Sequence, residues 1–369
     1  DAFISKFNPD GTKDWTRTLG SGSDDNAHAL TTGSDGSIYI AGSAGFQIDD
    51  QTYSGYYDAY ISKYNPDGTK EWTKLFGTID WDSAHALTTG SDGSIYIAGR
   101  AGSIYDDDSG DLDGQTNSGG ADAFISKFNP DGTKEWTKLF GTADDDRAYA
   151  LTTGSDGSIY IAGRISGDLD GQTNNGNYDA YIIKFNPDGT KEWTRLLGGT
   201  GEDRGRALIT GSDGSIYIAG YTNGDLDGQT NSGDYDAFIS KFNPDGTKEW
   251  TRLFGTAYDD RAYALTTGSD GLIYIAGETK GDLDGQTNSG DYDVFIIKLS
   301  EKDELPNPIL PITINQQPTD INISPNSFDE NIDAESVIAT LSTEDKDIGD
   351  SHTYELIKGE GDTDNDSFT

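Results

Sequence analysis

The ten-residue stretch Gly-Ser-Asp-Gly-Ser-Ile-Tyr-Ile-Ala-Gly, from Gly33 to Gly42, occurs five times in this chain. Its first half is typical of a tight turn, because Asp bonds its own backbone and Gly accepts a positive φ. Its second half has the composition of a β-strand, so each copy is predicted to be the heart of a β-hairpin. The other copies are Gly90 to Gly99, Gly154 to Gly163, Gly211 to Gly220 and Gly268 to Gly277, the last with Leu272 in place of a Ser.

Composition narrows the class of protein. The 369 residues carry 65 acidic against 26 basic side chains, for a formal net charge of −39. Such a field repels nucleic acid and anionic lipid and favours divalent cations, so no nucleic-acid partner is expected. Without Cys there is no disulfide framework or thiolate metal site, and no apolar run is long enough for membrane insertion. The regular alternation of aromatic residues predicts a folded chain despite its low hydrophobic content.

A longer segment, Asp1 to Gly11, recurs with its Asp at residues 58, 122, 179, 236 and 293. The period is 57 residues, with one spacing of 64 caused by an insertion around Gly102 to Asp108. Each period contains four strand candidates and no helical periodicity. In the third period they are Arg147 to Thr153, Ser158 to Ala162, Asp179 to Phe185 and Glu192 to Leu197.

Four strands per period with no helix between them predict an all-β fold, a β-propeller of four-stranded blades with five repeats visible. A β-solenoid is the competing arrangement, but its coils are shorter. The apolar Ile38–Gly42 type of strand is expected inside the blade, and charged strands such as Lys70 to Phe76 at the rim. The blades are then Ala27 to Phe76, Ala84 to Phe140, Ala148 to Leu197, Gly205 to Phe254 and an incomplete one, Ala262 to Leu299.

The N-terminal hairpin, Asp1 to Leu19, has the composition of two outer strands without inner ones. In one closure, Asp14 to Leu19 completes the last blade of a five-bladed ring. In the other, the hairpin is the remainder of a blade whose ring extends upstream. The chain also lacks Met and begins inside a repeat, which predicts a fragment of a longer protein.

The repeat resembles the bacterial seven-bladed β-propeller (SBBP) repeat family. The resemblance rests on an Asp, an Ala-rich strand, Asp-Gly, an apolar strand ending in Gly, and Asp-Ala-Phe-hydrophobic-x-Lys-aromatic, in that order. It covers the predicted propeller domain, Asp1 to Leu299, and implies a scaffold rather than a reaction. The matching residues are Asp260, Ala262 to Leu265, Asp270-Gly271, Ile273 to Gly277 and Asp236 to Phe242.

After Leu299 the composition changes. Residues 300–319 contain four Pro and predict an extended linker. Residues 320–369 resemble the first half of a cadherin-like β-sandwich, with strand-like pieces at Ile321 to Ser324, Ser336 to Thr343 and His352 to Lys358. In that family a Glu of a Glu-Asn motif and both Asp of Asp-x-Asp bind Ca²⁺. The resemblance therefore implies calcium ligation by Glu330, Asp345 and Asp347.

A second set of acidic residues lies in a repeated loop, Gly-Asp-Leu-Asp-Gly-Gln-Thr-Asn. Two carboxylates at i and i+2 could direct several oxygens toward one Ca²⁺. The alternative is that Asp and Asn cap a tight turn, and the loop lacks the third Asp and terminal Glu of an EF-hand. The candidate ligands are Asp111 and Asp113, Asp168 and Asp170, Asp225 and Asp227, and Asp282 and Asp284.

Other repeated residues favour structural roles. His28 and His85 share a slot that holds other residue types in later repeats, so we expect them at a blade surface without a catalytic role. One Asp per period, as at Asp82, is expected to tie neighbouring blades by backbone hydrogen bonds. One Trp per period, as at Trp72, is expected to pack between blades rather than bind sugar. Trp81 stands outside the repeat and is the better candidate for an exposed contact.

These observations predict a non-enzymatic, calcium-binding adhesion or surface-interaction protein that is secreted or displayed at the cell surface. Its expected partners are cell-surface or matrix proteins or glycans. The first alternative is a lectin-like propeller that binds glycans through its loops. The second is a polysaccharide-active enzyme, which would need paired carboxylates that differ from blade to blade.

Overall fold

The four strands predicted for the third repeat form one antiparallel sheet, in chain order β13-β14-β15-β16. The strands are β13 (Arg147–Thr153), β14 (Ile159–Ile165), β15 (Asp179–Phe185) and β16 (Lys191–Leu197). The turn before β14 follows its sequence: Gly157 has φ 82°, and the Asp156 carboxylate accepts a hydrogen bond from the Ser158 backbone. The predicted blade is confirmed.

The computed structural model describes residues 1–103, 110–269, 271–299, 310–311, 320–324 and 340–344. Four further sheets have the same strand order as the third. They are β3 (Asp25–Thr32), β4 (Ile38–Ala44), β5 (Asp58–Tyr64) and β6 (Lys70–Phe76); β7 (Ser83–Thr89), β8 (Ile95–Ala101), β11 (Asp122–Phe128) and β12 (Lys134–Phe140); β17 (Asp203–Thr210), β18 (Ile216–Thr222), β19 (Asp236–Phe242) and β20 (Lys248–Phe254); and β21 (Asp260–Thr267), β22 (Ile273–Thr279), β23 (Asp293–Leu299) and β24 (Leu310–Pro311). A small hairpin, β9 (Asp111–Leu112) and β10 (Gln115–Thr116), is added in the second repeat.

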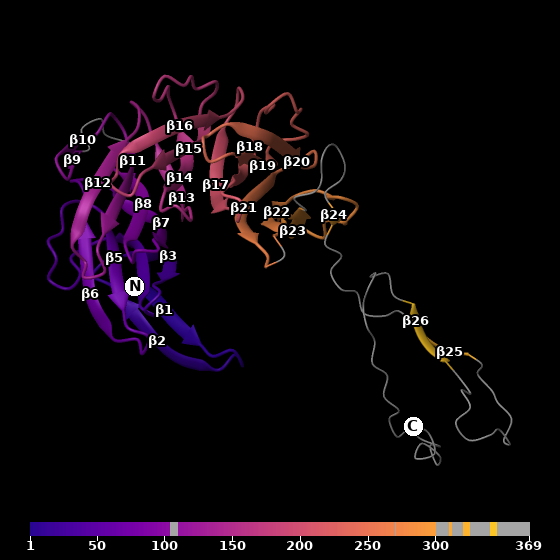
Figure 1. The fold of residues 1–369 in the computed structure, drawn as a ribbon, viewed down its shortest axis with the longest axis horizontal. Helices are drawn as coiled ribbons and strands as arrows, with labels where there is room; N and C mark the ends of the chain where they lie inside the picture. The colour runs from indigo at the N-terminus through magenta and orange to yellow at the C-terminus, as the bar shows by residue number, and fades with distance from the viewer. Residues whose placement is uncertain (104–109, 270, 300–309, 312–319, 325–339, 345–369) are drawn as a thin grey trace, which may run out of the picture. The chain divides into compact units, whose positions relative to one another are not determined.

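Neighbouring sheets pack face to face, with their apolar residues between them. Ala59 and Ile61 of the first blade meet Phe124 and Phe128 of the second in one buried cluster. The first strands, β3, β7, β13, β17 and β21, pack successively and lie along the inner side of the arc of blades (Figure 1). Trp72 bridges to the next blade, because its indole donates a hydrogen bond to the Pro130 carbonyl at 3.3 Å. The predicted inter-blade role of the rim Trp is confirmed.

The N-terminal hairpin, β1 (Ala2–Phe7) and β2 (Lys13–Leu19), is a separate two-stranded sheet. Ile4 and Trp15 pack against Tyr60 of the first blade, which buries one face of the hairpin. The fourth position of the last sheet belongs to β24. The closure in which Asp14 to Leu19 completes the last blade is therefore not the one adopted.

The chain divides into two compact units, Asp1–Leu310 and Pro311–Thr369, and this division falls inside the predicted linker. In the second unit, β25 (Asp320–Ser324) pairs with β26 (Thr340–Glu344) in antiparallel register. The third predicted strand, His352 to Lys358, lies outside the described residues. The cadherin-like sandwich stays a prediction.

A β-bulge interrupts the first strand of each of the five blades. In β13 the bulge lies between Ala148 and Ala150, so the residue between them, Tyr149, leaves the regular alternation. The facing residue in β14 is Gly163, where a Cβ would overlap the Arg147 carbonyl oxygen. The bulge therefore depends on this glycine. The five bulged residues, here called the axial residues, are His28, His85, Tyr149, Arg206 and Tyr263.

Candidate anion-binding site at the propeller axis

The axial residues contact one another in a row that crosses all five blades. The rings of His28 and His85 lie 5.7 Å apart, and those of His85 and Tyr149 lie 5.8 Å apart and are stacked. The Arg206 guanidinium then lies 4.2 Å from the Tyr149 ring centre and 5.6 Å from that of Tyr263. A positive charge is thus held between two aromatic rings at the centre of the propeller.

A cavity of about 510 Å³, here called the axial cavity, opens beside this row. Three of its lining residues are arginines and none is an Asp or Glu, although the chain's net charge is −39. The lining residues are His28, His85, Arg147, Tyr149, Arg204, Arg206, Tyr221 and Tyr263. A lining of guanidinium, imidazole and phenol groups is suited to an anion.

The two histidines contribute hydrogen-bonding groups rather than charge. Burial lowers the pKa of His85 to about 3, and its Nδ1 lies 3.0 Å from the Ala148 carbonyl oxygen. Burial also lowers the pKa of His28. Both rings are therefore neutral near pH 7, and the charge of the cavity comes from its arginines. The predicted surface position of this slot agrees with the structure, in which His28 and Tyr263 are exposed and His85, Tyr149 and Arg206 are half-buried.

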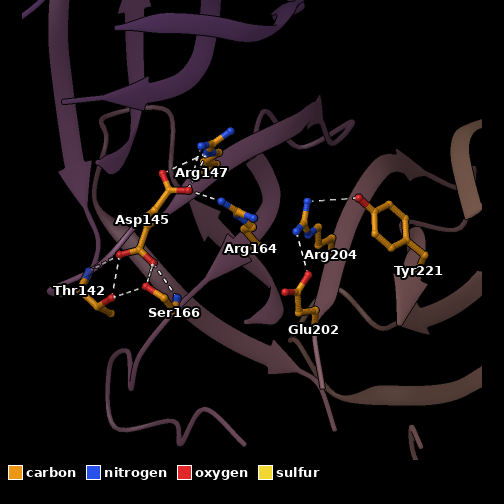
Figure 2. Close-up of polar contacts among 9 residues, drawn as sticks. Thr142, Asp145, Arg147, Arg164, Ser166, Glu202, Arg204 and Tyr221 are labelled. Carbon is orange, nitrogen blue, oxygen red and sulfur yellow. Dashed lines mark hydrogen bonds and ion pairs between the residues drawn. The ribbon is translucent and has the colours of Figure 1, made fainter. Parts of the chain in front are cut away.

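Acidic residues around the axial cavity hold several arginines in place (Figure 2). Asp145 forms ion pairs with Arg147, at 2.9 Å, and with Arg164. Glu202 pairs with Arg204 at 2.8 Å. Each of these acids directly precedes the Asp that begins the blade, so the same local geometry recurs. A second cavity of about 620 Å³, the side cavity, is lined by Arg147, Arg164 and Glu202 among others.

Several guanidinium donors in this region remain unused. The Nε atoms of Arg164, Arg204 and Arg261 are buried and have no hydrogen-bond partner. Arg206 forms no ion pair within the described part of the chain, where its contacts are the rings of Tyr149 and Tyr263. Buried unpaired donors are costly, and an incoming carboxylate, sulfate or phosphate would satisfy them.

The repeated acidic loop forms a tight turn. Leu169 and Gln172 exchange both backbone hydrogen bonds, and the two residues between them, Asp170 and Gly171, have φ of 50° and 74°. Asp168 accepts a hydrogen bond from the Asn174 backbone at 2.9 Å. These contacts recur for Asp225 with Asn231 and Asp282 with Asn288.

The second carboxylate of each loop reaches the outer strand. Asp170 contacts Lys191 and Thr194, and these hydrogen bonds outweigh burial and hold the pKa of Asp170 below its usual value. The same contacts join Asp113 to Lys134 and Thr137, and Asp227 to Lys248 and Thr251. Asp111 lies in β9, and Asp284 forms no ion pair within the described residues.

Within the described ranges, no group of three or more His, Cys, Asp or Glu side chains could hold a metal ion. Glu330, Asp345 and Asp347 lie outside those ranges. Calcium binding by either set of residues stays a prediction. No helix in the described part is long and apolar enough to cross a membrane.

Replacing the Asp of the loop by the neutral Asn distinguishes the tight-turn interpretation from the calcium interpretation. We expect Asp170→Asn to lower the melting temperature by the same few degrees with and without 1 mM CaCl₂, because it breaks the contacts with Lys191 and Thr194, worth about 1 kcal/mol. Asp284→Asn, at the equivalent position without an ion pair, is the control and should change little. If Asp170→Asn lowered the melting temperature only in the presence of CaCl₂, the result would instead support the calcium interpretation.

The structural Asp of each repeat behaves as predicted. Asp146 accepts backbone hydrogen bonds from Thr142, at the end of the preceding blade, and from Ser166 at 2.7 Å. The axial residues, in contrast, were missed as a site. Their signal is present in the sequence, because one slot of a nearly constant repeat changes among His, Tyr and Arg.

Comparisons with known proteins agree with this architecture. A β-propeller repeat family model (SBBP) matches residues 192–227, and a β-propeller domain of unknown function (DUF5122) matches residues 33–71, 154–192 and 211–249. Regulatory protein FlaEY of Caulobacter vibrioides is 30% identical over 266 residues, which cover 64% of this chain and 28% of that protein. An uncharacterised WD repeat-containing protein of Acanthamoeba polyphaga mimivirus is 23% identical over an alignment that covers 81% of this chain and 28% of the viral protein. The chain thus spans about a quarter of the length of these relatives.

Solved structures show weaker likeness. A Bacteroides caccae protein of unknown function is 11% identical with a TM-score of 0.42, over 79% of this chain and 85% of that one. An ulvan lyase is 12% identical with a TM-score of 0.47, over 78% of this chain and 73% of the lyase. Likeness at this level says nothing about activity. The five stacked four-stranded sheets and the two family matches together identify the chain as a β-propeller repeat protein.

Proposed function

We propose that this chain is a non-enzymatic binding protein whose axial cavity receives the anionic group of a ligand. The lining of the cavity carries the proposal: it contains no carboxylate, and beside Arg147 and Arg204, which are paired with acids, it holds Arg206, which forms no ion pair within the described residues. Guanidinium groups bind carboxylate, sulfate and phosphate oxygens through paired hydrogen bonds. Arg206 is already held between two rings, so it loses little conformational freedom on binding.

The charge of the whole chain limits the kind of ligand. A net charge of −39 repels a long polyanion such as nucleic acid, whereas the axial cavity attracts a charge that enters it. A short ligand, or one end of a longer ligand, fits both conditions. This favours the glycan alternative over a nucleic-acid partner.

The chemistry of the lining supports binding rather than hydrolysis. Glycoside hydrolysis by the usual route needs two carboxyl groups, and the axial cavity contains none. Incubation with an acidic oligosaccharide should therefore return it intact by mass spectrometry, and cleavage products would contradict the non-enzymatic assignment. Secretion, calcium binding and adhesion stay predictions from the sequence.

Arg206 offers the direct test. We expect Arg206→Gln to weaken binding of sodium sulfate and of galacturonate, measured by calorimetry, by about tenfold or more, because a charge-assisted hydrogen bond contributes about 2 kcal/mol. Arg252→Gln is the control, since Arg252 lies on the outer strand β20 over the Trp250 ring. Equal affinities for the Arg206 variant and the unmodified protein would overturn the proposal.

A further inference from the structure

The second blade lacks the acid of the acid–arginine pattern around the axial cavity. The residue before the blade's first Asp is an acid at Asp145, Glu202 and Asp259, and each pairs with an arginine. At the second blade this residue is Trp81. In the second blade an exposed aromatic side chain thus stands where these three blades have a carboxylate.

Trp81 is held in a fixed orientation. It forms a parallel β-bridge with Tyr57. Its ring stacks on that of Tyr57 with centres 4.8 Å apart, and on that of Tyr56 at 6.3 Å. Tyr56 remains 66% exposed and Trp81 40% exposed. These three residues, here called the aromatic platform, form a rigid apolar surface that solvent can reach.

The same replacement leaves Arg100 without the acid that its own blade would supply at position 81. Arg100 occupies the position that Arg164 occupies in the next blade, where Asp145 neutralises it. Within the described residues Arg100 forms no ion pair, and burial lowers its pKa; the charge of Arg147 adds to that effect, and the charges of Asp145 and Asp82 oppose it. A buried guanidinium beside a second guanidinium favours an external anion.

The aromatic platform and the axial cavity belong to one continuous surface. A third cavity, of about 290 Å³, is lined by Trp81, Tyr57 and Arg100, and it shares His28, His85 and Arg147 with the axial cavity. Its remaining lining is Asp82, whose carboxylate accepts hydrogen bonds from the Thr78 and Gly102 backbones, and Asn26, Ser43 and Ser83. The side chains of Asn26, Ser43 and Ser83 form no hydrogen bonds within the described part of the chain, so they are available to ligand hydroxyl groups.

We propose that the aromatic platform and the axial cavity together bind one acidic oligosaccharide, with a sugar ring on Trp81 and acid groups at Arg100 and Arg206. A pyranose presents an apolar face to an aromatic ring and hydroxyl groups at its edge, which matches Trp81 beside Asn26, Ser43 and Ser83. A uronate carboxylate or a sulfate ester supplies the acid group. This inference rests on the proposed function of the axial cavity.

The test compares ligands of two lengths on two variants. The probes are tetragalacturonate, a sulfated tetrasaccharide, galacturonate and sodium sulfate, each titrated by calorimetry. We expect Trp81→Ala to weaken tetrasaccharide binding about tenfold, as expected for loss of one stacked ring, and to leave sulfate binding unchanged. Trp81→Phe should retain most of the affinity. Phe7→Ala, which removes an exposed ring on the hairpin, is the control.

The outcomes separate this inference from the proposed function. If Arg206→Gln weakens every probe while Trp81→Ala leaves tetrasaccharide binding unchanged, the anion site stands and the oligosaccharide inference is overturned. If neither variant changes any affinity, both are overturned. No measurable binding of either tetrasaccharide to the unmodified protein also overturns the inference. A preference between the two tetrasaccharides identifies the acid group as carboxylate or sulfate.

Discussion

Replacing Gly163 by Ala is expected to destabilise the propeller by about 3 kcal/mol or more, enough to unfold the third blade or prevent its assembly. A Cβ at this position would overlap the Arg147 carbonyl oxygen and approach the Tyr181 ring to 2.9 Å. The obstruction is backbone, so it cannot be relieved by a rotamer change. Thermal unfolding followed by circular dichroism measures the loss.

Two other glycines make the comparison specific. Gly171 has nothing within 4 Å of an added Cβ but has φ 74°, so Gly171→Ala should cost only about 1 kcal/mol. Gly290 has open space and no positive φ, so Gly290→Ala should change stability by less than about 0.5 kcal/mol. If Gly163→Ala were as mild as Gly290→Ala, the bulge would not need a glycine opposite Tyr149. A folded Gly163 variant should also bind sulfate less well, because Tyr149 supports Arg206.

The second large effect is the dependence of stability on pH. It originates where one blade meets the next, here called a junction, at pairs of buried carboxyl groups. Asp58 and Asp82 flank the same small space, since a Cβ at Gly77 would lie 2.8 Å from Asp58 Oδ1 and 2.5 Å from Asp82 Oδ2. Asp82 accepts backbone hydrogen bonds from Thr78 at 2.7 Å and Gly102 at 3.1 Å, whereas Asp58 Oδ1 is buried without a partner. A proton on the Asp58 carboxyl group would allow it to donate a hydrogen bond to Asp82.

Burial raises the pKa of Asp58 to about 6 and that of Asp82 to about 7. Burial likewise raises the pKa of Asp122 to about 6 and of Asp179 to about 7 at later junctions. The folded chain therefore holds protons that the unfolded chain releases, so this stabilisation is complete below about pH 4 and is lost as pH rises through 6 to 7. A carboxyl group raised from 3.8 to about 6 corresponds to on the order of 3 kcal/mol.

We therefore expect the melting temperature to fall between pH 5 and pH 8. Turn carboxylates act in the opposite direction below about pH 4, because hydrogen bonds from Thr69 hold the pKa of Asp67 below its usual value. The optimum should lie near pH 4 to 5.

Asp58→Asn tests the junction itself. The amide is neutral and can donate to Asp82, so the variant should melt a few degrees above the unmodified protein at pH 8 and at about the same temperature at pH 5. Asp67→Asn removes the same charge from an exposed turn and controls for general relief of repulsion. A cation held between the carboxylates would give the reverse result, with stability rising with pH and the Asp58→Asn substitution destabilising.

Local structure followed from the sequence because its determinants are neighbours along the chain. The turn at Asp156 and Gly157, the strands on either side of it and the rim position of Trp72 were all predictable from a few adjacent residues. The exposure of Trp81 was also predictable, since it lies outside the repeat. The pairing of Asp170 with Lys191 was not, because it joins a loop to a strand 21 residues later.

The site at the axis was decided by tertiary structure. Simple strand alternation places His28 and Tyr149 on a blade face, but the bulge in each first strand turns these side chains toward the axis. Their contact then requires five blades to pack in succession, which no single repeat encodes. The repeat by itself determined the scaffold. The meeting of Arg147 with Arg204 and Arg206 in one cavity without a carboxylate arose from the packing of blades, since Arg147 lies on β13 and the other two lie on β17 of the next blade.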